Sequence, residues 1–441
     1  GVNINNKKGE TMDKFAIQGL NRIQGEVEVL GVKNGILPLI AASLLAAKGT
    51  TVITNVPDFR DVATLSQILR QMGAIVNYDC NSRVIEINCE SISSFIAPYE
   101  LVKQMRASFL VIGPLLARFR QAEISLPGGC AIGARSVNMH IDALGALGAE
   151  IVQNEGSIKA KTDGLKGSTF YFDFPTHTGT ENIMTAACLA KGTTTLINAA
   201  CEPEVVDLAC FLNKMGARIS GAGTPVIMIE GCKQLSAVEH NAIPSRIETA
   251  FFLGAAAITR GELIIKNAIL ENLGIVVEKM RQMGMEITDL GDNRVLARTT
   301  KQLQSVSFTT WPYPGFPTDF QPQMMALIST SQGTGIVKET VFENRFMHVQ
   351  EFNRFGTNIR THLDEAVVTG VSTLKGAPVM ASDLQAGAGL ILVALAAEGQ
   401  SIIDRVYHID RGYERIEERL TKLGASITRF NPIKKEAKQN E

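Results

Sequence analysis

Apolar residues in this chain gather in helix-length runs that have no polar face. Five of the runs are GILPLIAASLLAA (35–47), SFLVIGPLLA (108–117), IMTAACLA (183–190), IETAFFLGAAAI (247–258) and AGAGLILVALAA (386–397). A helix that is hydrophobic on all sides is buried on all sides. Together with one more helix after Thr318 and Asp319, the pattern predicts six buried helices.

Two other patterns alternate with the buried runs. Amphipathic segments such as VEKMRQMG (277–284) and YERIEERLTKLG (413–424) are charged along one face, so we expect helices with one solvated side. β-Branched, apolar segments follow the buried runs and predict strands. These segments are TTVITNV (50–56), TTTLINA (193–199), ELIIKNA (262–268), TGIVKET (334–340) and QSIIDRV (400–406).

Glycines mark an internal repeat. Six helical segments end in an apolar residue and a glycine, at intervals of 68 to 75 residues, namely Gly73, Gly148, Gly216, Gly284, Gly356 and Gly424. Five of the six units also carry a glycine 23 to 25 residues earlier, namely Gly49, Gly192, Gly261, Gly333 and Gly399. A glycine directly after a helix is typical of the left-handed residue that ends it.

The repeat indicates the fold class. Six buried helices with sheets and charged helices outside them predict helix-cored α/β (α+β) domains. A chain of 441 residues fits two domains, and six units divide naturally into three per domain. The repeat does not show where the chain crosses from one domain to the other.

Composition and charge exclude several classes of protein. The chain has 45% hydrophobic residues, which excludes disorder, and 43 basic against 44 acidic residues. There is no basic excess, so we expect neither nucleic acid nor a membrane as partner, although a local basic pocket remains open. No long apolar run is free of Gly, Pro or polar residues, and the polar start is no signal peptide. We expect residues 1–11 and 431–441 to be flexible tails.

Cysteine and histidine usage indicates no metal and no disulfide framework. The seven cysteines form no CxxC pair, and the six histidines show no metal-binding spacing. This usage fits a reducing cytoplasm. Cys188 and Cys210 lie in helical segments, so we expect both to be inert core residues.

Polar residues stand at the starts of the buried helices. Asn34, Thr180, Ser245, Thr318 and Ser382 are candidate N-caps. Capping does not explain Lys33, Arg106 and Arg246, because the helix dipole disfavours cations at an N-terminus. Cations at several helix starts instead indicate a bound anion, such as a phosphate or a carboxylate.

The segment PGGCAIGAR, residues 127–135, is a second candidate site. Its glycines and proline predict a flexible loop. Cys130 lies five residues before Arg135, and a nearby cation lowers the pKa of a thiol and favours reactivity. Asp319 in GFPTDF is either a helix cap or a catalytic base, and the local sequence leaves both open.

Several motifs resemble those of the UDP-N-acetylglucosamine 1-carboxyvinyltransferases, a group of enolpyruvyl transferases. The resemblance runs from about Asp13 to Phe430. Its motifs are GVKNGILPL, MRASFLVIGPLLAR, LPGGCAIGAR, GTENIM, EPEVVDL, IPSRIETAFF, FPTDFQ, ETVFENRFMHV and YHIDRGYERIE. The resemblance implies a two-domain inside-out α/β barrel of six βαβαββ units with the active site in the interdomain cleft. One domain would comprise residues 12–32 and 242–430, and the other residues 33–241 with the cysteine loop.

The resemblance also implies the reaction and its residues. The family transfers the enolpyruvyl group of phosphoenolpyruvate to the 3-hydroxyl of UDP-N-acetylglucosamine by addition and elimination, without a cofactor, and so commits the cell to peptidoglycan. The implied catalytic residues are Cys130 as proton donor and fosfomycin target, Asp319 as base, and Lys33. The implied phosphoenolpyruvate ligands are Lys33, Asn34, Arg135, Arg411 and Gln385. The implied UDP-N-acetylglucosamine ligands are Arg106, Arg135, Ser136, Val137, Asn138, Met139, Thr176, His177, Thr178, Gly179, Asp319, Val341 and Arg345.

The chain departs from the family pattern within this site. Gln385 stands where the family has Arg, and a neutral amide binds a carboxylate more weakly, by about 1–3 kcal/mol. Ser136 replaces a usual Pro, Ser245 replaces a usual Asp, and His177 with Thr178 replaces small residues near the diphosphate. Two alternatives therefore stay open: a transferase for another nucleotide-linked acceptor, and a paralogue that binds the nucleotide sugar without catalysis. We expect a cytoplasmic enzyme, and a monomer is favoured.

Overall fold

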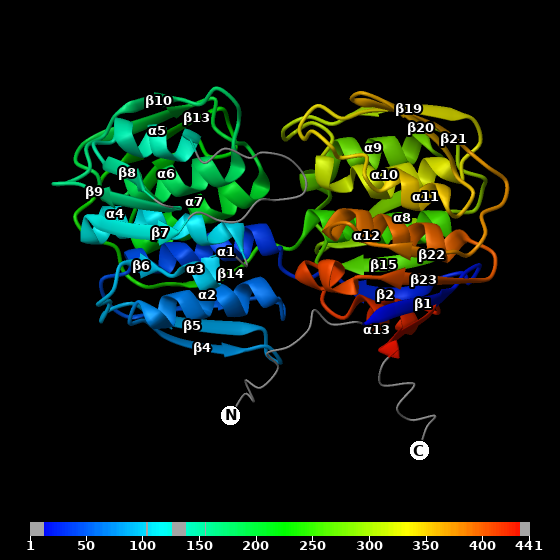
Figure 1. The fold of residues 1–441 in the computed structure, drawn as a ribbon, viewed down its shortest axis with the longest axis horizontal. Coiled ribbons are helices and arrows are strands. Elements are labelled where there is room, and N and C mark those ends of the chain that lie inside the picture. The colour runs from blue at the N-terminus through cyan, green and yellow to red at the C-terminus, as the bar shows by residue number, and fades with distance from the viewer. Residues whose placement is uncertain (1–12, 103–104, 126–137, 155, 433–441) are drawn as a thin grey trace, which may run out of the picture. The chain divides into compact units, whose positions relative to one another are not determined.

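The chain divides into two compact units. The computed structural model describes residues 13–102, 105–125, 138–154 and 156–432 (Figure 1). Unit 1 comprises Gly1–Val29 and Ser245–Glu441, and unit 2 comprises Leu30–Pro244. Each unit has its own hydrophobic core. The resemblance implies a domain of residues 33–241, and these exact limits remain a prediction.

Unit 2 consists of three consecutive repeats. Its elements, with 3₁₀ helices written η, are α1 (Lys33–Ala42), η1 (Ser43–Leu45), β3 (Thr50–Thr54), α2 (Arg60–Gln71), β4 (Ile75–Asp79), β5 (Val84–Asn88), β6 (Ile96–Ala97), α3 (Tyr99–Val102), η2 (Arg106–Val111), α4 (Ile112–Phe119), β7 (Gln121–Ser125), α5 (Asn138–Ala146), β8 (Glu150–Asn154), β9 (Ser157–Lys161), β10 (Thr169–Tyr171), α6 (His177–Ala187), β11 (Thr193–Ile197), α7 (Pro203–Met215), β12 (Arg218–Ser220), β13 (Val226–Glu230) and β14 (Glu239–Asn241).

Unit 1 repeats the plan and draws two strands from the start of the chain. Its elements are β1 (Lys14–Gln18), β2 (Gln24–Glu28), α8 (Arg246–Ile258), β15 (Glu262–Lys266), η3 (Leu270–Leu273), α9 (Gly274–Gln282), β16 (Glu286–Gly291), β17 (Arg294–Arg298), β18 (Phe308–Thr309), η4 (Thr318–Phe320), α10 (Gln321–Ser329), β19 (Thr334–Lys338), α11 (Val349–Asn353), β20 (Asn358–His362), β21 (Glu365–Thr369), β22 (Pro378–Met380), α12 (Leu384–Ala396), β23 (Gln400–Asp404), η5 (Val406–Arg411), α13 (Ile416–Lys422) and β24 (Ser426–Phe430).

The strands of the described chain form six four-stranded sheets, three in each unit. In each sheet one edge strand pairs parallel with its neighbour, and the other pairs are antiparallel. Three sheets close over long distances in sequence. Strand β14 pairs with β3 in unit 2. In unit 1, β2 pairs with β15, and β1 lies between β23 and β24.

The six helices predicted to be buried form the cores of the two units. They are α1, α4 and α6 in unit 2 and α8, α10 and α12 in unit 1. Figure 1 shows α8, α10 and α12 running side by side through unit 1, with β15 and β19 on opposite sides of them. The predicted class of six helix-cored α/β repeats is therefore confirmed.

Ten of the eleven repeat glycines have a positive φ, between 84° and 111°. Gly261 is the exception, because Arg260, with φ 52°, takes the left-handed conformation one residue earlier. The repeat without an early glycine likewise uses an arginine, since Arg120 ends α4 with φ 62°. The left-handed turn is thus kept in the repeat even where the glycine is not.

Four of the five predicted N-caps are wrong. The side chain of Ser245 accepts from the N–H of Glu248 as predicted, whereas the caps of α6 and α12 are Thr176 and Asp383. The hydroxyl of Thr180 lies inside α6 and accepts from Ala200 instead. Asn34 and Thr318 lie within their helices, behind the non-capping residues Val32 and Pro317.

Candidate functional site

The start of α1 carries Lys33 and Asn34, as the sequence indicates. The Nζ atom of Lys33 lies 3.5 Å from Oδ2 of Asp61, which belongs to the first turn of α2. Both side chains are mostly buried, whereas Asn34 is exposed. The side chain of the first residue of α1 is thus a cation held by a buried carboxylate, and a helix N-terminus itself favours anions.

An ion pair at the start of α6 joins His177 to the buried Glu181, one turn further along the helix. Nε2 of His177 lies 3.1 Å from Oε1 of Glu181, whose side chain is 1% exposed. Burial by itself lowers the pKa of His177, but the carboxylates of Glu181, Glu202 and Glu204 together raise it to about 10. Burial and the neighbouring carboxylates also raise the pKa of Glu181. The start of α6 therefore carries an imidazolium at neutral pH.

The buried His140 connects two segments that are far apart in sequence. Its ring lies 3.1 Å from Nδ2 of Asn182 and 3.5 Å from Oγ1 of Thr178, and its ring meets Phe109 edge to face. Asn182 in turn accepts from the N–H of Gly113 at 2.8 Å. The start of α5, with the half-buried Met139 and the exposed Asn138, is thereby held close to Thr176–Gly179.

Five of the residues expected in unit 2 have side chains that the structure does not describe. Cys130, Arg135, Ser136 and Val137 lie outside the described residues. Arg106 begins η2 at the expected helix start, but its side chain is outside the described part.

An ion pair in unit 1 joins two of the predicted residues. The guanidinium of Arg345 lies 3.3 Å from Oδ1 of Asp319, and the side chain of Arg345 is 2% exposed, against 35% for Asp319. Arg345 also lies over the ring of Phe342, 5.7 Å from its centroid. A buried arginine therefore orients a carboxylate that remains accessible.

Glu339 supports this pair and was not predicted from the sequence. Its Oε1 accepts from the N–H groups of Val341 and Phe342 and from the hydroxyl of Thr310. Its Oε2 accepts from Thr318, the residue before Asp319, at 2.9 Å. One buried carboxylate thus fixes both the loop before Arg345 and the turn that carries Asp319. No local pattern separates Glu339 from an ordinary strand-end glutamate.

Gln385 lies in the first turn of α12, which Asp383 caps through the N–H groups of Gln385 and Ala386. Its side chain is 8% exposed and contacts two buried residues, Gln323 and Tyr413. The sequence singled out Gln385 but neither of its partners.

His348 lies beside the same helix starts. Burial and the nearby Arg345 lower its pKa to about 4, against the opposing effect of Asp383. The imidazole is therefore neutral at physiological pH, and it packs edge to face on Phe352.

Arg411 ends η5, and the residue before it is anchored firmly. Asp410 accepts from the guanidinium of Arg429 at 2.6 and 2.9 Å, and Glu417 contacts the same guanidinium at 2.6 Å. Arg429 lies on β24, so the η5 turn is fixed to the sheet that contains both ends of the described chain.

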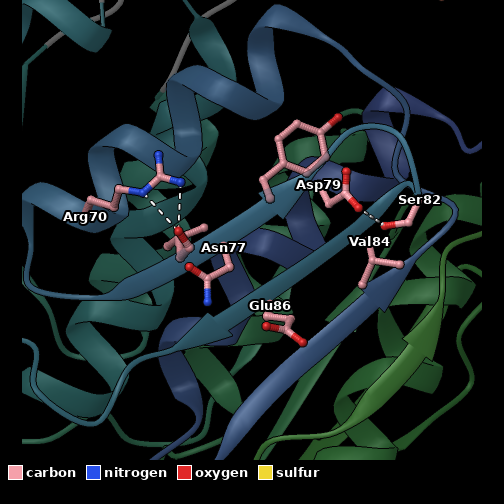
Figure 2. Close-up of a pocket in the computed structure, with 8 residues that line it drawn as sticks. Arg70, Asn77, Asp79, Ser82, Val84 and Glu86 are labelled. Atoms are coloured by element: carbon pink, nitrogen blue, oxygen red, sulfur yellow. Dashed lines mark hydrogen bonds between the residues drawn. The ribbon is translucent and has the colours of Figure 1, made fainter. Parts of the chain in front are cut away.

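Two of the hollows in the described chain can be compared with the expected site. One, of about 540 Å³, lies on α2, β4 and β5, and none of the residues expected in the site lines it (Figure 2). Some of its polar groups are paired locally, because Arg70 donates to the carbonyl of Val76 and Ser82 donates to Asp79. The other, of about 120 Å³, lies beside Pro317, between Tyr313 and Arg246 at the start of α8.

Two further properties concern the described residues alone. None of their helices combines the length and the apolar character needed to cross a membrane. No three or more of their His, Cys, Asp and Glu side chains are grouped so as to hold a metal ion.

Cys210, expected in the core, is exposed on α7, because it lies on the solvent side of an amphipathic helix.

The fold and these helix starts define a class. The family model of EPSP synthase (3-phosphoshikimate 1-carboxyvinyltransferase) matches residues 17–420. The enolpyruvyl transferase NikO from Streptomyces tendae is 26% identical, with a TM-score of 0.85 over 95% of this chain and 99% of that one. EPSP synthase from Acinetobacter baumannii, at 17% identity and a TM-score of 0.75 over 95% of this chain and all of that one, shares the fold. The architecture is the two-domain inside-out α/β barrel of the carboxyvinyl transferases.

Two relatives narrow the class. UDP-N-acetylglucosamine 1-carboxyvinyltransferase 2 of Carboxydothermus hydrogenoformans is 50% identical over 95% of this chain and 100% of its own length. UDP-N-acetylglucosamine 1-carboxyvinyltransferase of Myxococcus xanthus is 51% identical over 95% of this chain and 99% of its own length. The chain belongs to the UDP-N-acetylglucosamine 1-carboxyvinyltransferase family of enolpyruvyl transferases.

Proposed function

We propose that the protein transfers the enolpyruvyl group of phosphoenolpyruvate to the 3-hydroxyl of UDP-N-acetylglucosamine and releases phosphate. The observation that carries the proposal is 50–51% identity, over nearly the whole chain, to relatives named for this activity. In this proposal the enzyme acts in the bacterial cytoplasm, in the synthesis of peptidoglycan precursors. It acts as a monomer and without a cofactor.

The chemistry requires three kinds of group. An acid protonates C3 of phosphoenolpyruvate, so that C2 becomes electrophilic and the sugar hydroxyl attacks it. A base accepts the hydroxyl proton. Cations stabilise the charges of the substrate and of the tetrahedral intermediate until phosphate leaves. In this chain Cys130 is the acid, Asp319 is the base, and Lys33, Arg135 and Arg411 are the cations.

The geometry of unit 1 supports the role of Asp319. Arg345 and Glu339 fix the turn that carries Asp319 from two sides. A carboxylate held in one orientation, yet still accessible, is suited to take a proton from a bound hydroxyl. Val341 and Arg345 lie on the segment that Glu339 anchors, and they contribute to the acceptor site.

The geometry of unit 2 supports the binding of anions. Lys33 is held by Asp61 at the start of α1, next to Asn34, so its charge is fixed where phosphate binds. The acceptor's uridine diphosphate binds at Asn138, Met139 and Thr176–Gly179, which His140 holds together. Arg106, Arg135, Ser136 and Val137 complete this binding site in the proposal.

The test is phosphate release from phosphoenolpyruvate, measured with and without UDP-N-acetylglucosamine. We expect release that requires both substrates and saturates in each. Folded protein that releases phosphate no faster than a blank would overturn the proposal. Shikimate 3-phosphate serves as the control acceptor and is expected to support no turnover.

One observation favours a second candidate function. The His177–Glu181 ion pair occupies the segment assigned to the diphosphate, where the family usually has small residues. Larger side chains here change the space beside the diphosphate, so the second candidate function uses a nucleotide-linked acceptor other than UDP-N-acetylglucosamine. Competition assays with other UDP-sugars distinguish the two, because the preferred acceptor has the highest kcat/KM.

A further inference from the structure

Three buried side chains form a hydrogen-bonded triangle at the helix starts of unit 1. Nε2 of Gln323 lies 2.9 Å from Oε1 of Gln385, and Oη of Tyr413 lies 3.3 Å from the same oxygen. Nε2 of Gln323 also reaches Oη of Tyr413 at 3.4 Å. Gln323 is 0% exposed and Tyr413 2%, so the two partners are sealed while Gln385 keeps a small accessible surface.

The oxygen and the nitrogen of the Gln385 amide differ in their hydrogen bonds. The carbonyl oxygen of Gln385 accepts twice, whereas its Nε2 donates to no group in the described chain and is not among the sealed atoms. The amide of Gln385 therefore turns its oxygen inward and presents its N–H₂ group outward. Burial raises the pKa of Tyr413, so its hydroxyl stays a donor at all physiological pH values.

The triangle and the candidate base interact electrostatically. The carboxylate of Asp319 contributes to the raised pKa of Tyr413, which places the two groups within electrostatic range of each other. The ring of Tyr413 is itself fixed by Phe251, whose centroid is 5.1 Å away. An outward N–H₂ group in the first turn of α12 adds two donors to a helix N-terminus, and both features favour an anion.

We propose that Gln323 and Tyr413 are positioning residues that hold the amide of Gln385 with its N–H₂ group toward the carboxylate of phosphoenolpyruvate. This inference rests on the proposed function for the identity of the anion. A neutral donor replaces the charge that the family places here, so orientation carries more of the binding energy. An amide that turned by 180° would present its oxygen to the anion, and that contact is repulsive.

The first experiment compares Tyr413→Phe and Gln323→Met with the wild-type enzyme. Each removes one hydrogen bond to Oε1 of Gln385, which corresponds to a roughly fivefold weaker contact. We expect the KM for phosphoenolpyruvate to rise about fivefold in each variant, with kcat and the KM for UDP-N-acetylglucosamine within about twofold of the wild type.

Gln321→Met is the matched control. Gln321 lies in the same turn of α10 and is also 0% exposed, but its amide has no hydrogen-bond partner in the described chain. Gln321→Met replaces the same amide by the same side chain as Gln323→Met, but it leaves the triangle intact. The KM for phosphoenolpyruvate should therefore stay at the wild-type value. Melting temperatures of all variants establish that they are folded.

A double-mutant cycle separates positioning from general structural damage. In a Gln385→Ala background, Tyr413→Phe should leave the KM for phosphoenolpyruvate unchanged, because no amide remains to be oriented. An equal rise with and without the Gln385 side chain overturns the inference, and so do single variants that bind like the wild type. If the wild type shows no turnover, the proposed function fails separately. Calorimetric titration with phosphoenolpyruvate then measures the differences in affinity between the variants and the wild type directly.

Discussion

The imidazole of His177 lies 3.1 Å from the carboxylate of Glu181, one turn further along α6. Glu202 and Glu204 act on the same imidazole, so three carboxylates share one cation at the start of a buried helix. The pair makes stability depend on pH in a defined direction.

We expect His177→Val to lower the free energy of unfolding by about 3 kcal/mol near pH 6, because it leaves buried carboxylates without their partner. The folded-state pKa of about 10 lies above the unfolded value. The stabilisation is therefore complete below the unfolded pKa and is lost as the pH rises through about 10. Urea unfolding at several pH values measures this difference.

The control for this prediction is the double variant His177→Val with Glu181→Leu, which removes the pair together. It should recover much of the stability, because an apolar pair of similar volume often replaces a buried ion pair without loss. The difference in the free energy of unfolding between His177→Val and the wild type should shrink from pH 6 to 10. A difference that stays constant over this range would contradict the raised pKa of His177.

Cys130→Ala should abolish labelling by fosfomycin and most of the turnover. Cys89 and Cys188 are buried, and burial raises the pKa of Cys89 to about 12 and that of Cys188 further still, so neither offers a thiolate. Cys210 is exposed and provides the matched control. Mass spectrometry of Cys210→Ser should show full labelling, and a loss there would move the reactive thiol to α7.

Asp319→Asn should lower kcat by about a hundredfold or more, because an amide cannot accept the hydroxyl proton. The asparagine keeps the size of the side chain, so both KM values should change little. Asp364→Asn is the control, since Asp364 is an exposed carboxylate 3.6 Å from Lys338 on a hairpin of the same unit. If kcat responds equally to both changes, Asp319 is not the base.

Arg260 takes the left-handed conformation that a glycine takes in most of the repeats, and it gives a prediction about stability. Arg260→Gly should raise the free energy of unfolding by about 1 kcal/mol, because a left-handed residue with a side chain is strained. Gly284→Ala, at φ 101° with no atom near the added methyl group, should lower it by a similar amount. Gly274→Ala, at the start of α9 with φ −42°, should not lower the free energy of unfolding and should raise it slightly. Thermal unfolding of the three variants tests the order.

The repeat could be predicted from sequence because its signals are local. A glycine that ends a helix and an apolar run without a polar face each specify structure over a few residues. At α6 and α12 the predicted N-caps failed because several polar residues crowd the helix start, and packing decides which of them faces the N–H groups. Thr180 illustrates this, since its hydroxyl binds Ala200 rather than its own helix. At α1 and η4 no side chain caps the helix.

The support of the site could not be predicted from sequence for a different reason. Gln385 meets Gln323 across 62 residues and Tyr413 across 28, and no spacing rule joins positions that far apart. Glu339 is equally hidden, because two of its four hydrogen bonds come from Thr310 and Thr318, which lie 29 and 21 residues away in sequence. Sequence motifs indicated which residues face the substrates, whereas the residues that hold them required the fold.

The place of β1 between β23 and β24 has a consequence for how the protein is made. Unit 2 lies within Leu30–Pro244, so a ribosome that has passed residue 244 has delivered everything its core requires. Strand β1 precedes unit 2 in the chain, whereas both of its neighbours, β23 and β24, follow unit 2. During synthesis β1 therefore waits unpaired while unit 2 folds, and the sheet that anchors the η5 turn forms only after β24 has been made.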